Sequence, residues 1–147
     1  MVIRKSSDDF NQNFIRPKRV LFVCVENSFR SQIAEAFAHI YGGDYVMAYS
    51  AGSKPLGEVH PKAVATMKEI DYDLTRHSSK SLAEISDVQY DVAVTMGCGD
   101  ECPLVRASQR ESWDIPDPKN MAPEDIVAVR DRIAQKVKQL LASLNQS

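Results

Sequence analysis

Short apolar runs and longer stretches of helical periodicity follow one another along the chain. The run from Val20 to Val23 is typical of a strand that is covered on both faces. After it, apolar residues recur at helical spacing until the Gly42-Gly43 pair ends the pattern. On the same criteria the sequence predicts strands at 20–23, 45–50, 90–96 and around 113–115, and helices at 31–41, 61–70 and from 123 onward.

The predicted helices are amphipathic, so each has a face that we expect to pack on the core. The first carries Ile33, Ala34, Phe37 and Tyr41 on that face, and the second carries Ala63, Val64, Met67 and Ile70. The last helix has Pro123 at its start and acidic residues in its first turn, as is typical of helix N-termini. Its apolar stripe is Ile126, Val129, Ile133, Val137, Leu140, Leu141 and Leu144.

Strands that alternate with helices predict an α/β fold, with a parallel sheet flanked by helices. Ligands of such sheets bind beyond the carboxyl ends of the strands. Cys24 directly follows the first predicted strand, and Cys98 and Cys102 follow the third. We therefore expect all three cysteines at the same edge of the sheet.

The polarity of the chain also indicates where the folded domain begins. Residues 1–18 are polar, mixed in charge and without clear periodicity, so we expect a flexible N-terminal extension. Residues 19–147 are long enough to form a single domain with a sizeable core.

The composition narrows the classes of function. A net charge of −2 and a pI near 5.9 argue against a nucleic-acid-binding protein held by bulk electrostatics. No apolar run approaches the roughly 18 residues that a membrane span needs, and the N-terminal segment lacks the apolar core of a secretory signal. We therefore expect a cytoplasmic protein with no nucleic-acid or membrane partner.

Three cysteines, an odd number, do not suggest an extracellular disulfide framework. In a cytoplasmic chain, a few cysteines at the ends of strands indicate catalysis, redox chemistry or metal binding. The alternative is that each is a small buried apolar residue, as free cysteines often are.

The loop after the first strand has the composition of an oxyanion site. A loop of this length between strand and helix can turn successive backbone N–H groups toward one centre, helped by the helix N-terminus. Arg30 adds a planar fork for an oxyanion, and Cys24 would be stabilised there as a thiolate nucleophile. Asn27 tolerates positive φ in such a loop. The expected oxyanion-binding residues are Val25, Glu26, Asn27, Ser28, Phe29, Arg30 and Ser31.

These residues carry a family resemblance. The segment VLFVCVENSFRSQIAEAFA closely resembles the active-site segment of the low-molecular-weight tyrosine phosphatase superfamily, which includes the thioredoxin-coupled arsenate reductases. The match extends through YSAG, HPKAVATMKEIDYDL and WDIPDP. The resemblance implies a three-layer sandwich with a four-stranded parallel sheet, with Cys24 as nucleophile and Arg30 as oxyanion binder. The family pattern has glycine where Glu26 stands and a second cysteine where Phe29 stands.

A general acid is needed to protonate the leaving oxygen. The WDIPDP segment offers Asp114 and Asp117. The family places its acid immediately before a proline, so the resemblance implies Asp117, whose neighbour Pro118 restricts the local backbone. Asp114 would then be a turn or cap residue.

The loop alone does not distinguish a phosphatase from an arsenate reductase. Water can resolve a phosphocysteine, whereas reduction of arsenic needs a second thiol. In the interpretation as a reductase, Cys98 attacks Cys24 and releases arsenite, and Cys102 then attacks Cys98 to form a disulfide for an external dithiol such as thioredoxin. The resemblance supports this interpretation, because the arsenate reductases carry a C-G-D…C-P segment at this position.

The residues after Asp117-Pro118 also favour the reductase. Tyrosine phosphatases of this family have aromatic residues there that hold the phosphotyrosine ring, whereas this chain has Lys119 and Asn120. The main hypothesis is therefore an arsenate reductase, and the alternative is a phosphatase that acts on phosphate monoesters. A non-enzymatic anion-binding protein is a third hypothesis, which would follow if Glu26 blocked the loop.

Neither enzyme hypothesis requires a bound cofactor. The resemblance implies a potassium site, because four residues match positions that bind this ion in some arsenate reductases; the alternative is an internal salt bridge with cap residues. The four are Asn27, Glu35, Ser50 and Asp73. A zinc site built on Cys98 and Cys102 would need His60 or His77, and the sequence offers no second close pair of ligands.

Overall fold

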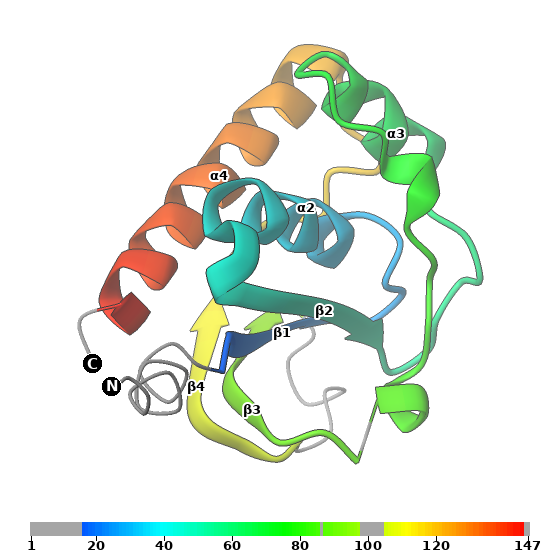
Figure 1. Cartoon of the computed structure of the whole chain (residues 1–147). Coiled ribbons are helices and arrows are strands. Elements are labelled where there is room, and N and C mark those ends of the chain that lie inside the picture. Colours follow the sequence, from blue (N-terminus) through cyan, green and yellow to red (C-terminus); the bar gives the residue numbers. More distant parts are fainter. Residues whose placement is uncertain (1–15, 86, 98–104, 146–147) are drawn as a thin grey trace, which may run out of the picture.

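The computed structural model describes residues 16–85, 87–97 and 105–145 (Figure 1). Its centre is a four-stranded sheet in the order β2-β1-β3-β4, in which every neighbouring pair is parallel. The strands are β1 (Lys18–Cys24), β2 (Val46–Gly52), β3 (Tyr90–Met96) and β4 (Ala107–Trp113). The parallel sheet flanked by helices confirms the fold class that the sequence predicts. Cys98 and Cys102 lie outside the described residues.

Alternate residues of β1 face two different apolar cores. Val20 and Phe22 belong to the larger core, together with residues of α2 (Arg30–Gly42), α3 (Pro61–Lys68) and α4 (Pro123–Asn145). Leu21 and Val23 belong to the smaller core on the other face, against the 3-10 turn η3 (Leu82–Ile85). All four side chains are buried, which explains why β1 is a continuous apolar run in the sequence.

The long helix α4 packs as its stripe predicts, since all seven apolar residues of the stripe are buried. Arg130 of the same helix is also buried, and its Nη1 donates to the backbone oxygen of Thr66 in α3 at 2.9 Å. A buried charge is costly unless it is paired, and Glu69 lies 3.3 Å from the same nitrogen. This contact ties α4 to the end of α3.

Three expectations about the elements are wrong in detail. The fourth strand is not at 113–115 but runs from Ala107 to Trp113, and most of it is exposed or half-buried. It is an edge strand with the sequence ASQRESW, so it lacks the alternation of a half-buried strand. Tyr41 and Ile70 do not reach the core: they are 41% and 39% exposed, because each lies at or beyond the last turn of its helix.

Among the described residues, no helix is long and apolar enough to cross a membrane.

Tyr90, at the start of β3, gives a test of the smaller core. The ring is almost fully buried, and its hydroxyl donates to the backbone oxygen of Ile85 at 3.0 Å. Burial, followed by the charges of Tyr49 and Asp87, raises the pKa of Tyr90 above the ordinary value of 10.0. Below pH 10 the protonated Tyr90 hydroxyl therefore contributes to the free energy of unfolding. That contribution is lost as pH rises, because the unfolded chain releases the proton that the folded chain keeps.

We expect Tyr90→Phe to lower the free energy of unfolding by about 1 kcal/mol at pH 7, because the Ile85 carbonyl loses its donor. Above about pH 10 the variant should lose stability less steeply than the wild type. Urea denaturation at pH 7 and at several alkaline values measures both effects. Parallel pH dependences for the two proteins would contradict this account of Tyr90.

Candidate active site

Cys24 is the last residue of β1, and Gly52 is its partner at the end of β2. Its side chain is 3% exposed, and its Sγ lies 2.9 Å from Ser31 Oγ in a hydrogen bond. The strand therefore fixes the position of the sulfur, and the first turn of α2 supplies a hydroxyl that contacts it.

The loop between β1 and α2 has its carbonyl groups turned outward. The backbone oxygens of Val25, Glu26 and Ser28 accept hydrogen bonds of 2.8 to 2.9 Å from backbone N–H groups in the segment 54–60. The described peptide bonds are all trans, so each N–H points opposite to the carbonyl of its own peptide unit. The N–H groups that follow these carbonyls therefore face the inside of the loop, where they form a cradle for an anion.

Asn27 stabilises the conformation of the loop between β1 and α2. It has a φ of 50°, a conformation that asparagine adopts more readily than most residues, and it is fully buried. Its Nδ2 donates to Ser31 Oγ at 2.8 Å, and its Oδ1 accepts from Lys80 N at 2.8 Å and from Gln32 Nε2 at 3.0 Å. Gln32 and Lys80 are parts of this support that the sequence analysis did not identify.

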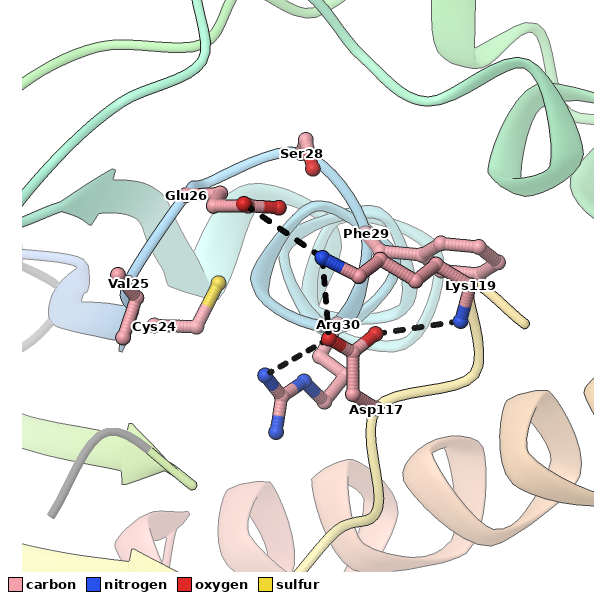
Figure 2. Close-up of a pocket in the computed structure, with 8 residues that line it drawn as sticks. All are labelled: Cys24, Val25, Glu26, Ser28, Phe29, Arg30, Asp117 and Lys119. Carbon is pink, nitrogen blue, oxygen red and sulfur yellow. Dashed lines mark hydrogen bonds and ion pairs between the residues drawn. The ribbon is translucent and has the colours of Figure 1, made fainter. Parts of the chain in front are cut away.

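Arg30 lies at the start of α2 and its guanidinium extends below the loop (Figure 2). Nη1 donates to the backbone oxygen of Ile115 at 2.9 Å, and Nη2 lies 3.9 Å from Asp117 Oδ2. Gly97, directly after β3, has a φ of 78°, a conformation that favours glycine, and a Cβ there would displace this guanidinium. The segment after β4 thus holds Arg30 and brings Asp117 to the pocket beside the loop. Asp114 is exposed and does not line the pocket.

A pocket of about 120 Å³ opens above the sulfur. Figure 2 shows the side chains of its rim turned toward one another. Lys119 Nζ lies 3.7 Å from Glu26 Oε2 and 3.9 Å from Asp117 Oδ2, so it offsets the negative charge of both. The residues that line the pocket are Cys24, Val25, Glu26, Ser28, Phe29, Arg30, Asp117 and Lys119.

Glu26 and Phe29, the two departures from the family pattern, both have partners in the structure. The Glu26 carboxylate, which the sequence places beside the anion, pairs with Lys119 at the rim instead of standing alone. The Phe29 ring is buried and packs against the His60 ring, with their centroids 5.1 Å apart. Lys119 also belongs to the site, although the sequence indicates only that it replaces an aromatic residue of the phosphatases. Its position directly after Asp117-Pro118 is the sequence feature that points to the pocket.

The expected potassium ligands all have partners within the protein. Ser50 Oγ donates to Glu35 Oε1 at 2.6 Å, and Lys80 Nζ lies 3.8 Å from the same oxygen. Asp73, by contrast, is exposed, and its carboxylate caps a turn by accepting from Thr75 N at 3.0 Å. The oxygen of the Asn27 side chain is also occupied by two donors.

Glu35 is buried with charged and polar partners. Burial alone would raise the pKa of its carboxyl, but hydrogen bonds with His39 and Ser50 and the charges of His77 and Lys80 hold the pKa below its usual value. Burial also lowers the pKa of His77 from 6.5.

Comparisons with known proteins identify the family of the chain. The family model described as low molecular weight phosphotyrosine protein phosphatase matches residues 19–147. A protein of Synechocystis sp. named glutaredoxin arsenate reductase is 34% identical over 131 residues, which cover 87% of this chain and 99% of that protein.

Two solved structures are also similar. One, described as an arsenate reductase in the phosphate binding state, has a TM-score of 0.79 at 34% identity and covers 86% of this chain and 98% of its own. The other, a thioredoxin-dependent arsenate reductase of Corynebacterium glutamicum, has a TM-score of 0.72 at 29% identity and covers 92% of this chain and 66% of its own. The chain belongs to the low molecular weight phosphotyrosine protein phosphatase family and is close to its arsenate reductase members.

Proposed function

We propose that this protein is an arsenate reductase that reduces arsenate to arsenite through a Cys24 adduct and a relay of three cysteines. The observation that carries the proposal is the position of Cys24 Sγ at the base of a loop whose N–H groups face inward, with Arg30 and Asp117 beside it. This arrangement binds a tetrahedral oxyanion and presents a nucleophile to its central atom.

In the first step the Cys24 thiolate attacks arsenic, and a bond between arsenic and oxygen breaks. Asp117, as general acid, supplies a proton to the oxygen, which leaves as water. Arg30 and the loop N–H groups balance the charge on the remaining oxygens. The product is an adduct in which arsenic is still pentavalent and is bound to the Cys24 sulfur.

In the second step the Cys98 thiolate attacks the Cys24 sulfur. A disulfide forms, and the electron pair of the sulfur–arsenic bond stays on arsenic, which leaves as trivalent arsenite. Cys102 then attacks Cys98 and frees Cys24. An external dithiol finally reduces the Cys98–Cys102 disulfide, so two electrons pass from thiols to arsenic in each turnover.

The rim of the pocket supports an inorganic substrate. Lys119 and Glu26 form an ion pair at the mouth, so the side chain after Asp117-Pro118 is charged and hydrated. An aryl phosphate would have to place its ring against these charges, which costs desolvation of the ion pair. Arsenate has no such group.

We therefore expect Lys119→Tyr to raise kcat/KM for an aryl phosphate by roughly two- to tenfold, because an added ring is worth about 0.5–1.5 kcal/mol beside an aromatic substrate. The same variant should bind arsenate less tightly, since one positive charge at the mouth is lost. Steady-state kinetics with both substrates measure the change. Lys62→Gln is the matched control, because Lys62 does not line the pocket and its Nζ donates to the backbone oxygen of Lys119, not to the side chain.

The proposed partners are a dithiol reductant and a tetrahedral oxyanion. Two similar proteins are named for glutaredoxin and for thioredoxin, so either is a suitable reductant to test. The relay needs cysteines that are kept reduced between turnovers, which fits a cytoplasmic location. The proposed reaction requires no metal or potassium ion.

The experiment that tests the proposal supplies arsenate together with a thioredoxin or glutaredoxin system and follows NADPH oxidation. The proposal predicts sustained arsenate-dependent oxidation, with arsenite as the product. Efficient hydrolysis of aryl phosphate with no arsenite from any reductant would instead assign the protein as a phosphatase, since Cys24, Arg30 and Asp117 serve either reaction.

A further inference from the structure

A second group of chemically active side chains lies apart from the anion loop. Glu35, His39 and His77 each offer one ligand atom, and the three atoms lie within 4.8 Å of one another. Glu35 and His39 are four residues apart on α2, so they share one face of the helix. His77 comes from the end of the 3-10 turn η2 (Leu74–Arg76). Two separate segments of the chain therefore direct these three groups to one point.

The two distances from Glu35 to the histidine nitrogens match those between ligands of a metal site. Glu35 Oε2 lies 3.4 Å from His39 Nε2 and 3.5 Å from His77 Nδ1. Around a tetrahedral zinc ion with bonds of about 2.1 Å, neighbouring ligand atoms are about 3.4 Å apart. One carboxylate oxygen with two imidazole nitrogens is a ligand set that suits first-row divalent metals. We propose that Glu35, His39 and His77 bind a divalent transition-metal ion, with Zn²⁺ as the favoured ion.

The surrounding residues orient these ligands. Ser50 Oγ donates to Glu35 Oε1 at 2.6 Å, which leaves Oε2 for the ion. His77 Nε2 lies 2.7 Å from Tyr72 Oη. Histidines that bind metals with one nitrogen almost always donate a hydrogen bond from the other, and Tyr72 is placed to accept it. The cluster thus has both its ligands and the outer contacts that hold them.

Binding requires one proton to move within His77. Without a metal, Nδ1 donates to Gln32 Oε1 at 3.0 Å, because an amide oxygen can only accept. With Nδ1 on the ion, the proton resides on Nε2 and is donated to Tyr72 Oη. The imidazole changes tautomer and releases no proton, so the hydrogen bond to Gln32 is lost and the existing hydrogen bond with Tyr72 reverses its direction.

The site is accessible and its charge is partly balanced. The His39 side chain is 43% exposed, whereas those of Glu35 and His77 are 11% and 6% exposed, so an ion enters past His39. Lys80 Nζ lies 3.8 Å from Glu35 Oε1, the oxygen away from the proposed ion, and donates to Ser78 O at 2.9 Å. The ammonium reduces the net negative charge, so we expect weaker binding than at sites with several anionic ligands.

The test titrates the full, reduced chain with Zn²⁺ by calorimetry and with Co²⁺ by absorption spectroscopy. We expect a site that takes one ion per chain, with a Co²⁺ spectrum that lacks thiolate-to-metal charge transfer. His39→Ala removes a ligand at an exposed position and should weaken Zn²⁺ binding by more than about tenfold. Glu35→Gln should do the same. His60→Ala removes a histidine outside the cluster and should leave the affinity unchanged.

Two results would overturn the proposal. One is an unchanged Zn²⁺ affinity in folded His39→Ala and Glu35→Gln. The other is Zn²⁺ binding that disappears when Cys98 and Cys102 are replaced by serine, which would place the ion on thiols. Excess K⁺ should not displace Zn²⁺, because imidazole nitrogens are poor ligands for hard alkali cations; displacement would count against a nitrogen-containing site.

Discussion

Replacing Cys24 with serine should abolish arsenate reduction and aryl phosphate hydrolysis together. Both reactions begin with attack by the Cys24 sulfur, and a hydroxyl in its place is a far weaker nucleophile at neutral pH. We expect kcat to fall by roughly four orders of magnitude or more, as is typical when a covalent nucleophile is removed. Coupled reductase assays and aryl phosphate assays on the same preparation measure the two losses.

The control for this variant is its ability to bind an oxyanion. The loop N–H groups and Arg30 do not depend on the sulfur, so Cys24→Ser should still bind phosphate when titrated by calorimetry. Serine also keeps a hydrogen bond to Ser31 within reach. If either reaction continued at an appreciable rate in the folded variant, Cys24 could not be the nucleophile.

Replacing Cys98 or Cys102 with serine should separate the two reactions. Either change removes a thiol that the relay needs, so we expect multiple-turnover arsenate reduction to be lost. Hydrolysis of an aryl phosphate needs only Cys24, Arg30 and Asp117, so it should stay within about twofold of the wild type, as for substitutions away from the reacting atoms.

The two variants should also differ from each other. Cys98→Ser should release no arsenite at all, because nothing attacks the adduct. Cys102→Ser should release one equivalent and then stop with Cys24 joined to Cys98. Sustained arsenate reduction in the double variant would show that an external thiol resolves the adduct directly, and the relay would be wrong.

Much of the fold follows from local patterns in the sequence. Val20 to Val23 in β1 and Val92 to Val94 in β3 are apolar and buried on both faces of the sheet, so their apolar runs reveal the strands. The stripe of α4 is visible because every turn of the helix contacts the core. β4 was misplaced because an edge strand needs hydrogen bonds from only one neighbour and can be polar throughout.

The sequence predicts the site residues that lie close together along the chain. It does not predict those that meet only through tertiary contacts. Cys24, Asn27 and Arg30 occupy one loop, so their spacing indicates an oxyanion cradle. The pairing of Lys119 with Glu26 depends on how a distant segment packs over that loop, and no local pattern encodes it. The potassium site stays a prediction.

The most direct test mixes the reduced protein with one equivalent of arsenate in the absence of any reductant. Free thiols are then alkylated, arsenite is quantified, and peptides are identified by mass spectrometry. The relay predicts one equivalent of arsenite, a disulfide between Cys98 and Cys102, and alkylated Cys24. Release of no arsenite, with all three cysteines alkylated, would contradict it.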